Sequence, residues 1–223
     1  MPTYRILFVG LGKMGFHMAG YLSKNKNFKL FVFNRTKSVE HKWKKKFIAE
    51  SYNFKNDIKF DFIISCLKDD NAVNTFFNKF VKTSNFHKNS IIIDHSTISL
   101  RQIDILSSLF KQRKVKFLDA PITGGEEGAK KGSLSVMVGG TELSFNKSKS
   151  IISSYSKSIT HMGKLGTGQL TKFTNQILIC GILYSISEAY LFSKKNNLDQ
   201  QKIFNAIKNG AASSWQFTNR YLT

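Results

Sequence analysis

The chain has 223 residues, 41% of them hydrophobic, which is enough to bury one large domain, or one domain and part of a second. Its formal net charge is +20, from 34 Lys and Arg against 14 Asp and Glu. The lysines are scattered among Asn, Phe and Ile instead of forming one stripe, so the charge does not favour a nucleic-acid-binding or membrane-surface protein.

The first predicted strand, residues 4–9, leads directly into the glycine-rich segment VGLGKMG. Its glycines have the G-x-G-x-x-G spacing of a dinucleotide-binding turn, and a predicted helix follows at about 14–23. We expect Gly10 to permit the tight turn, Gly12 to let a pyrophosphate approach the backbone, and Gly15 to let the helix pack on the strand. The alternative is a turn that binds no ligand. The predicted cofactor contacts in this loop are Gly10, Leu11, Gly12, Lys13, Met14 and Gly15.

The second predicted strand, residues 29–33, ends at the sequence FNRT. An acidic residue at this point would bind the ribose 2′-hydroxyl of NAD. The chain instead has Asn34, Arg35 and Thr36. An arginine can pair bidentately with a 2′-phosphate and stack on adenine, and the two neutral side chains can add hydrogen bonds. The sequence therefore predicts NADP in preference to NAD, against the alternative of an ordinary surface arginine.

Further along, strand-like runs alternate with amphipathic helical segments. Strands are predicted at 61–67, 91–94 and 115–118, and helices at 71–82 and 100–111. This alternation is typical of an α/β fold with a doubly wound, Rossmann-type parallel sheet. Two shorter strands are predicted at 134–138 and 158–162, and from about residue 166 only helix is expected. We therefore expect an NADP-binding domain at 1–163 and an all-helical domain at 164–223.

The longest apolar stretch, residues 177–192, contains two serines and a glutamate. It is too short and too polar to cross a bilayer comfortably, so a buried helix is expected. Cys66 and Cys180 lie in separate apolar runs without a pairing pattern, which favours a reducing cytoplasm. The chain enters its first strand almost at once, so no targeting segment is expected. The five histidines show no metal-ligand spacing, and no metal site is predicted.

Four stretches in order carry a resemblance to a known family. They are VGLGKMGFHMAGYL at 9–22, DHSTIS at 94–99, DAPITGGEEGAKKGSLSVMVGG at 119–140 and GKLGTGQLTKFTNQ at 163–176. Together they resemble the β-hydroxyacid dehydrogenase family, which includes 3-hydroxyisobutyrate dehydrogenase, tartronate semialdehyde reductase, the glyoxylate/succinic semialdehyde reductases and the larger 6-phosphogluconate dehydrogenase. The resemblance implies an NAD(P)-dependent oxidoreductase that acts on a small hydroxy or oxo acid as a homo-oligomer.

The resemblance also implies roles for single residues. Lys172 matches the catalytic lysine of the family, and Asn175, one helical turn later, matches a substrate-binding asparagine. Thr123, Gly124 and Gly125 match the segment that binds the substrate carboxylate, with threonine in place of the usual serine. Thr97 matches a threonine near the nicotinamide ribose, and the backbone at Leu67 matches a cofactor contact.

The position of Lys172 agrees with acid/base chemistry. Hydride transfer to a carbonyl carbon requires a proton at the oxygen, and a lysine can supply it if its pKa falls toward neutrality. Burial and a helix N-terminus both disfavour the charged ammonium group. The alternative is a solvated lysine at a helix end.

The family pattern continues beyond the last residue with a helical stretch that carries a Lys-Asp pair. The resemblance therefore implies that 164–223 is a C-terminally truncated helical domain for substrate binding and dimerisation. The expected function is an NADP-dependent oxidoreductase that interconverts a small 2- or 3-hydroxy acid and its oxo acid or semialdehyde, with Lys172 as general acid/base. The alternative is a non-catalytic dinucleotide-binding module that acts through macromolecular contacts. For His95, a loop histidine is favoured over a nicotinamide contact.

Overall fold

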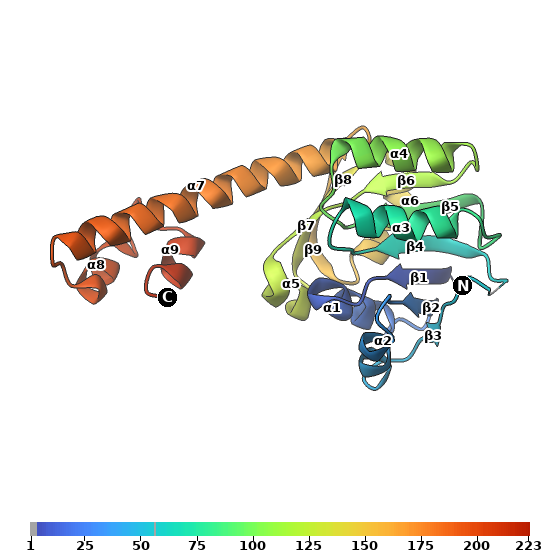
Figure 1. The fold of residues 1–223 in the computed structure, drawn as a ribbon, viewed down its shortest axis with the longest axis horizontal. Helices are drawn as coiled ribbons and strands as arrows, with labels where there is room; N and C mark the ends of the chain where they lie inside the picture. The colour runs from blue at the N-terminus through green and yellow to red at the C-terminus, as the bar shows by residue number, and fades with distance from the viewer. Residues whose placement is uncertain (1–3, 56) are drawn as a thin grey trace. The chain divides into compact units, whose positions relative to one another are not determined.

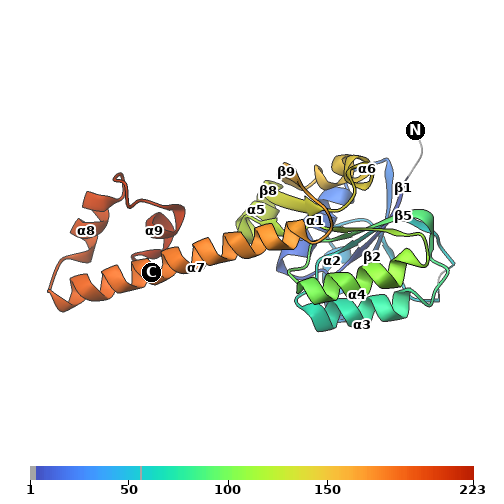
Figure 2. The ribbon, with the colours of Figure 1, turned by 90° about the horizontal axis from the view of Figure 1, so that it is seen from above.

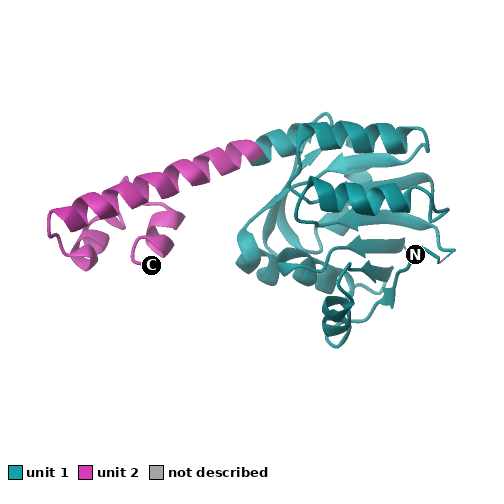
Figure 3. Ribbon diagram, viewed as in Figure 1, with its two compact units in different colours: residues 1–172 teal, residues 173–223 magenta. Residues whose placement is uncertain are grey.

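The computed structural model describes residues 4–55 and 57–223 and divides into two compact units, Met1–Lys172 and Phe173–Thr223 (Figure 3). Helix α7 (Thr167–Lys195) begins in the first unit and continues into the second. Its first turn is held in the first unit because Gly168 and Gln169 are buried there. The units therefore meet within a helix, whereas the sequence predicts a boundary between residues 163 and 164.

A nine-stranded sheet lies at the centre of the first unit, within residues 4–55 and 57–172 (Figure 1). Its order is β3-β2-β1-β4-β5-β6-β8-β7, with β9 paired to β8. The strands are β1 (Tyr4–Val9), β2 (Phe28–Phe33), β3 (Glu50–Ser51), β4 (Phe60–Ser65), β5 (Phe86–Asp94), β6 (Lys116–Asp119), β7 (Ile122–Thr123), β8 (Leu134–Gly139) and β9 (Ser156–Gly163).

Helices cover both faces of this sheet (Figures 1 and 2). One hydrophobic core joins the sheet to α1, α2, α5 and α6, and a second core joins the opposite face to α3 and α4. Two covered faces explain why the central strands are almost continuously apolar, as in the run ILFV of β1. These helices are α1 (Lys13–Leu22), α2 (Lys37–Lys44), α3 (Asp70–Phe80), α4 (Leu100–Lys111), α5 (Gly125–Lys131) and α6 (Glu142–Ile152).

The predicted parallel, doubly wound architecture is confirmed for β1 to β6, whose pairings are all parallel. The sheet reverses at β8, which pairs antiparallel with β6 and with β7. Strand β9 then pairs parallel with β8. The reversal is possible because a short hairpin-like excursion, β7 followed by α5, takes the place of a full helical crossover before β8.

The second unit contains the remainder of α7 together with α8 (Gln200–Ile207) and α9 (Trp215–Arg220). A small cluster ties its end to α7, because Ser193 hydrogen-bonds both Gln200 and Tyr221. Along α7 most apolar side chains are exposed in this chain, for example Ile177 at 72% and Phe192 at 69%. The expectation of a buried helix is therefore wrong for the isolated chain.

The same helix bears on the question of membrane contact. Among the described residues, α7 is the one helix that is long and apolar enough to cross a membrane by length and composition. The helix is longer than the apolar stretch at 177–192 because it begins ten residues earlier, so the argument from length applies to that stretch alone.

Candidate functional site

The three glycines of the turn between β1 and α1 have different surroundings. Gly10 has φ +97°, and a Cβ there would collide with the carbonyl oxygen of Cys66. A Cβ at Gly15 would collide with the carbonyl oxygen of Gly10 and crowd the Phe8 ring. A Cβ at Gly12 would meet nothing within 4 Å. Two glycines are thus required by packing inside the protein, while the third faces open space at the start of a helix, where an anion binds well.

This contrast predicts different outcomes for two alanine variants. Gly15→Ala should lower the free energy of unfolding by about 1–3 kcal/mol, because the new methyl group overpacks a filled site. Gly12→Ala should change that free energy by less than about 0.5 kcal/mol and still weaken NADPH binding by about tenfold or more. Urea unfolding and NADPH fluorescence titration measure the two effects. Equal destabilisation by both variants would contradict the assignment of Gly12 to ligand contact.

The segment after β2 lies beside the glycine turn. Asn34 links the two segments, because its Oδ1 accepts a hydrogen bond from the Leu11 amide at 2.9 Å and its Nδ2 donates to the Thr36 carbonyl at 3.0 Å. Thr36 precedes α2, and its side chain does not cap that helix. Glu40 is buried, accepts from the Asn34 amide and pairs with Lys37 at 3.0 Å. The carboxylate is therefore turned into the protein, and the position at the end of β2 itself is neutral.

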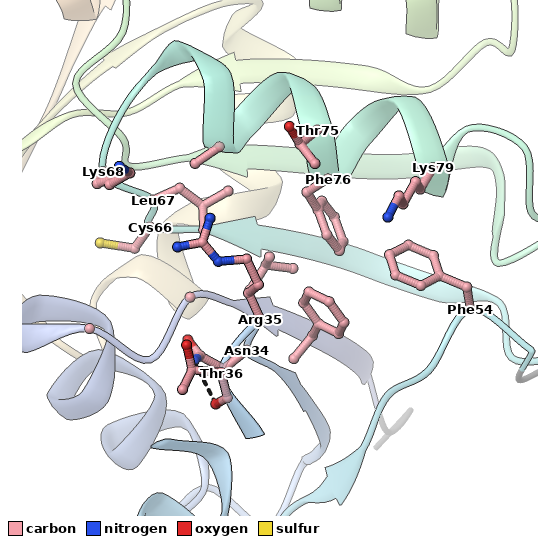
Figure 4. Close-up of a pocket in the computed structure, with 15 residues that line it drawn as sticks. Asn34, Arg35, Thr36, Phe54, Cys66, Leu67, Lys68, Thr75, Phe76 and Lys79 are labelled. Carbon is pink, nitrogen blue, oxygen red and sulfur yellow. Dashed lines mark hydrogen bonds between the residues drawn. The ribbon is translucent and has the colours of Figure 1, made fainter. Parts of the chain in front are cut away.

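A cavity of about 360 Å³ opens between the carboxyl ends of β1, β2 and β4 and helix α3 (Figure 4). Arg35 extends into it, and no ion pair among the described residues includes this arginine. Ligands of open α/β sheets bind at such a position, where the strand order reverses on either side of β1. The cavity is lined by Val9, Gly10, Gly12, Phe33, Asn34, Arg35, Thr36, Phe54, Cys66, Leu67, Lys68, Ala72, Thr75, Phe76 and Lys79.

One wall of the cavity is aromatic. The rings of Phe33, Phe54 and Phe76 contact one another with centroids 5.3–5.7 Å apart. Such a wall provides a flat apolar surface of the kind that a purine base needs. Cys66 lies at the same cavity, and burial raises the pKa of its thiol to about 12, so the side chain remains an unreactive thiol. The sequence analysis did not identify Phe54, Phe76 or Lys79, since they come from a loop and a helix without a binding motif.

The loop at 94–99 is anchored by buried polar groups. His95 is 2% exposed, its Nδ1 lies 2.6 Å from the Ala120 carbonyl and its Nε2 lies 2.8 Å from the Tyr155 hydroxyl. His95 is thus a loop residue, as the sequence favoured over a nicotinamide contact, and because it is buried with both ring nitrogens hydrogen-bonded, neither nitrogen is available to a cofactor. Thr97 is exposed in the same loop.

Two buried groups of this loop change the stability of the protein in opposite directions as the pH falls. Burial lowers the pKa of His95 to about 4, so stability falls as the pH drops from about 6.5 to 4. Burial raises the pKa of Asp94 to about 6, so stability rises as the pH drops from about 6 to 3.8. Each contributes about 3 kcal/mol over its window, and the two slopes largely cancel in the native protein.

The variant Asp94→Asn removes the contribution of Asp94 to the pH dependence of stability and leaves that of His95. The asparagine Oδ1 can still accept the hydrogen bonds from Ser65 and Ser96. We expect the free energy of unfolding of this variant to fall by about 3 kcal/mol more than that of the native protein between pH 6 and pH 4. Urea unfolding at several pH values measures the difference. Parallel pH curves for the two proteins would show that Asp94 ionises normally in the fold.

The predicted carboxylate-binding segment lies at the start of α5. Thr123 ends β7 and pairs with Ser135. Gly124 and Gly125 have φ values of +124° and +62°, which side chains other than glycine rarely adopt. A Cβ at Gly125 would meet nothing within 4 Å, so this backbone is open to a ligand. The following glutamates at 126 and 127 both pair with Lys130 at 3.1 Å, on the surface of α5.

Lys172 is half-buried in the second turn of α7. Burial lowers the pKa of its amine from the ordinary value. No ion pair among the described residues includes Lys172. Asn175 follows on the same helix, in the second unit, and its amide donates to Gln176 at 3.0 Å. Burial thus shifts the pKa of Lys172 in the direction that a proton donor needs, and its catalytic role stays a prediction.

The structure gathers part of the predicted site in one place. Gly10, Gly12, Asn34, Arg35, Thr36 and Leu67 line the cavity. Leu11 contributes its amide to Asn34 and buries its side chain, while Lys13 and Met14 begin α1 next to the turn. Thr97, the 123–125 segment and Lys172 do not line this cavity. In the part of the chain that the structure describes, no group of three His, Cys, Asp or Glu could hold a metal ion.

Comparison with known proteins agrees with this arrangement. Residues 5–163 match the NAD binding domain of 6-phosphogluconate dehydrogenase, and residues 166–222 match the NAD-binding model of NADP-dependent 3-hydroxyisobutyrate dehydrogenase. An uncharacterized oxidoreductase of Shewanella frigidimarina is 35% identical over 98% of this chain and 76% of its own length. The mitochondrial 3-hydroxyisobutyrate dehydrogenase of Drosophila melanogaster is 32% identical over 93% of this chain and 64% of its own length.

Solved structures give the same result. The 3-hydroxyisobutyrate dehydrogenase of Mycobacterium tuberculosis superposes with a TM-score of 0.85 and 25% identity, over 96% of this chain and 73% of that one. The relatives named here are thus longer than this chain. The chain belongs to the β-hydroxyacid dehydrogenase family, as a 3-hydroxyisobutyrate dehydrogenase-like oxidoreductase acting on CH–OH groups, with a nicotinamide-dinucleotide-binding Rossmann domain.

Proposed function

We propose that the protein is an NADP-dependent oxidoreductase that interconverts a small 2- or 3-hydroxy acid and its oxo acid or semialdehyde. The observation that carries the proposal is Lys172, a half-buried lysine with a lowered pKa on the helix that follows a dinucleotide-binding domain. Two of the relatives are named as 3-hydroxyisobutyrate dehydrogenases, which supports a small hydroxy acid as the substrate class.

In the proposed reaction the protein binds the acid and manages one proton. The nicotinamide, when bound, supplies or accepts the hydride at the substrate carbon. The backbone N–H groups at Gly124 and Gly125 hold the substrate carboxylate, with the Thr123 hydroxyl as a further donor. During reduction, Nζ of Lys172 gives its proton to the oxygen of the former carbonyl group and becomes a neutral amine. Solvent then returns a proton to the amine. During oxidation the neutral amine of Lys172 takes the proton from the substrate hydroxyl group.

The NADP preference is a separate part of the proposal. It is supported by Arg35, which extends into the cavity and forms no ion pair among the described residues, and by Thr36 and Lys37 at the start of α2. It is also supported by the absence of a carboxylate at position 34, where NAD-binding proteins place one. Asn34 holds Arg35 in place by joining this segment to the glycine turn.

We also propose that the exposed apolar side of α7 is covered by a second copy of this chain. Ile177, Leu178, Tyr184, Leu191 and Phe192 are 59–72% exposed, and an apolar surface of this kind marks an interface. A homo-oligomer is proposed rather than a membrane span, because the polar side chains of Lys172, Asn175 and Glu188 lie among the apolar residues of the helix. The molar mass measured by light scattering should be at least twice the 25.4 kDa of one chain. A monomeric mass would contradict the proposal. A cytoplasmic location is also proposed, from the two free cysteines.

Binding and turnover measured in sequence test the function. NADPH should bind first, as seen by its fluorescence, and should then be consumed on addition of a small semialdehyde or oxo acid. Tight NADPH binding with no turnover on any small acid would instead favour the alternative, a non-catalytic module that acts through macromolecular contacts. Absence of NADPH and NADH binding would contradict both.

A further inference from the structure

Asp119, at the end of β6, is fully buried beneath the first turn of α7. One carboxylate oxygen accepts the Gly166 amide at 2.7 Å, and the other accepts the Gln169 amide at 2.8 Å. These N–H groups lie at a helix start, where amides have no partner within the helix. The negative charge also faces the positive end of the helix dipole. Asp119 thus fixes where α7 begins.

Two glycines make room for this contact. A Cβ on Gly139 or on Gly168 would collide with the carboxylate of Asp119. At Gly168 it would also run into the carbonyl oxygens of Met137 and Asp119. The start of α7 therefore packs closely against the ends of β6 and β8, and the Asp119 carboxylate is the side chain that joins them.

Gln169 makes a second connection, to the 94–99 loop. It is fully buried, its Nε2 donates to the Ser96 carbonyl at 2.7 Å and its Oε1 accepts the Ile98 amide at 3.3 Å. The two bonded residues flank Thr97, which is exposed. Ser96 in turn accepts the Leu67 amide at 2.9 Å, at the wall of the cavity. Hydrogen bonds therefore run without a break from the cavity through this loop to α7.

We propose that Asp119 and Gln169 act together as a positioning clamp that fixes Lys172 relative to the loop carrying Thr97. The inference rests on the proposed function, in which that loop faces the nicotinamide and Lys172 faces the substrate oxygen. Lys172 follows Gln169 by three residues, so both lie on one face of one helical turn. Because the helix is rigid, a shift at Gln169 moves the lysine with it. A misplacement of about 1 Å can cost about 10²-fold in rate.

The variant Gln169→Met tests the clamp, because it keeps the length of the side chain and removes both of its hydrogen bonds. Gln102→Met is the matched control: Gln102 is also buried, lies in α4 close to the same loop, and its Nε2 has no partner within the described structure. Hydrogen exchange should become about tenfold faster in segments 95–99 and 164–172 of Gln169→Met only. Its kcat should fall by about 10- to 100-fold, with KM for NADPH changed less than about threefold.

Hydrogen exchange can be measured without turnover, so it tests the clamp even if the proposed function is wrong. Unchanged exchange in Gln169→Met would overturn the clamp, and faster exchange with native kcat would overturn its role in positioning Lys172. Failure of the native protein to turn over any small acid would instead contradict the proposed function. Should Gln169→Met not fold, Asp119→Asn provides the second variant. It should speed exchange more in 164–172 than in 95–99, and exchange equal to that of the native protein would again overturn the clamp.

Discussion

Replacing Lys172 by alanine is expected to reduce kcat by about 10²- to 10⁴-fold, which is the usual contribution of a positioned general acid. The amine is half-buried, its pKa is lowered by burial, and no ion pair among the described residues includes it. The Kd for NADPH should change less than about twofold, because Lys172 does not line the cofactor cavity. Single-turnover kinetics and NADPH titration separate the two quantities.

Lys164→Ala provides the control for this prediction. Lys164 is exposed and precedes α7. Its replacement by alanine removes the same charge as Lys172→Ala and leaves the proposed site intact. It should retain native kcat. The role of Lys172 would be contradicted if Lys172→Ala kept more than about a tenth of the native kcat, or if the two variants behaved alike.

Replacing Arg35 by alanine is expected to weaken NADPH binding by about 10- to 100-fold, which corresponds to the loss of hydrogen bonds between a guanidinium and a phosphate. Arg35 extends into the cavity beside the aromatic wall, and no ion pair among the described residues includes it. The Kd for NADH should change less than about threefold, since NADH has no 2′-phosphate. Titration of both cofactors against both proteins gives the comparison.

Arg113→Ala is the matched control for the arginine. Arg113 is exposed in the turn between α4 and β6, so its removal changes the net charge equally and leaves the cavity intact. If Arg113→Ala weakened NADPH binding as much as Arg35→Ala, the effect would come from the net charge of +20. An equal loss of NADPH and NADH affinity in Arg35→Ala would assign Arg35 to the adenosine and not to the phosphate.

The sequence was sufficient to predict the parallel core and the position of the glycine turn. Buried strands such as β1 are recognisable in the sequence as continuous apolar runs. The glycine spacing is recognisable because it follows from backbone sterics, which depend on local geometry alone. Gly10 and Gly15 pack as the motif requires, and Gly12 is left open. The preference for NADP rests on similar local reasoning at the end of β2 and stays a prediction.

Features that depend on distant residues could not be predicted in this way. His95 is a core histidine because Ala120 and Tyr155, from other parts of the chain, meet it in the fold. The aromatic wall needs Phe54 and Phe76, which carry no motif. The apolar pattern of α7 indicated burial but could not say whether this chain or another molecule provides the cover.

The antiparallel turn at β8 was missed for a similar reason. The direction of a strand is set by its partner and by the length of the connection, neither of which appears in the strand's own residues. Asp119 illustrates the same limit. Its bonds to Gly166 and Gln169 depend on residues about 50 positions away and form only where β6 and α7 meet in the fold.

The measurement that tests the account most directly is the oxidation of NADPH and of NADH, followed by absorbance, with glyoxylate, tartronate semialdehyde, succinic semialdehyde and methylmalonate semialdehyde. The account predicts turnover with at least one of these acids, with NADPH preferred over NADH. Turnover with NADH preferred would contradict the assignment of Arg35 to the 2′-phosphate. No turnover with either cofactor would contradict the proposed reductase.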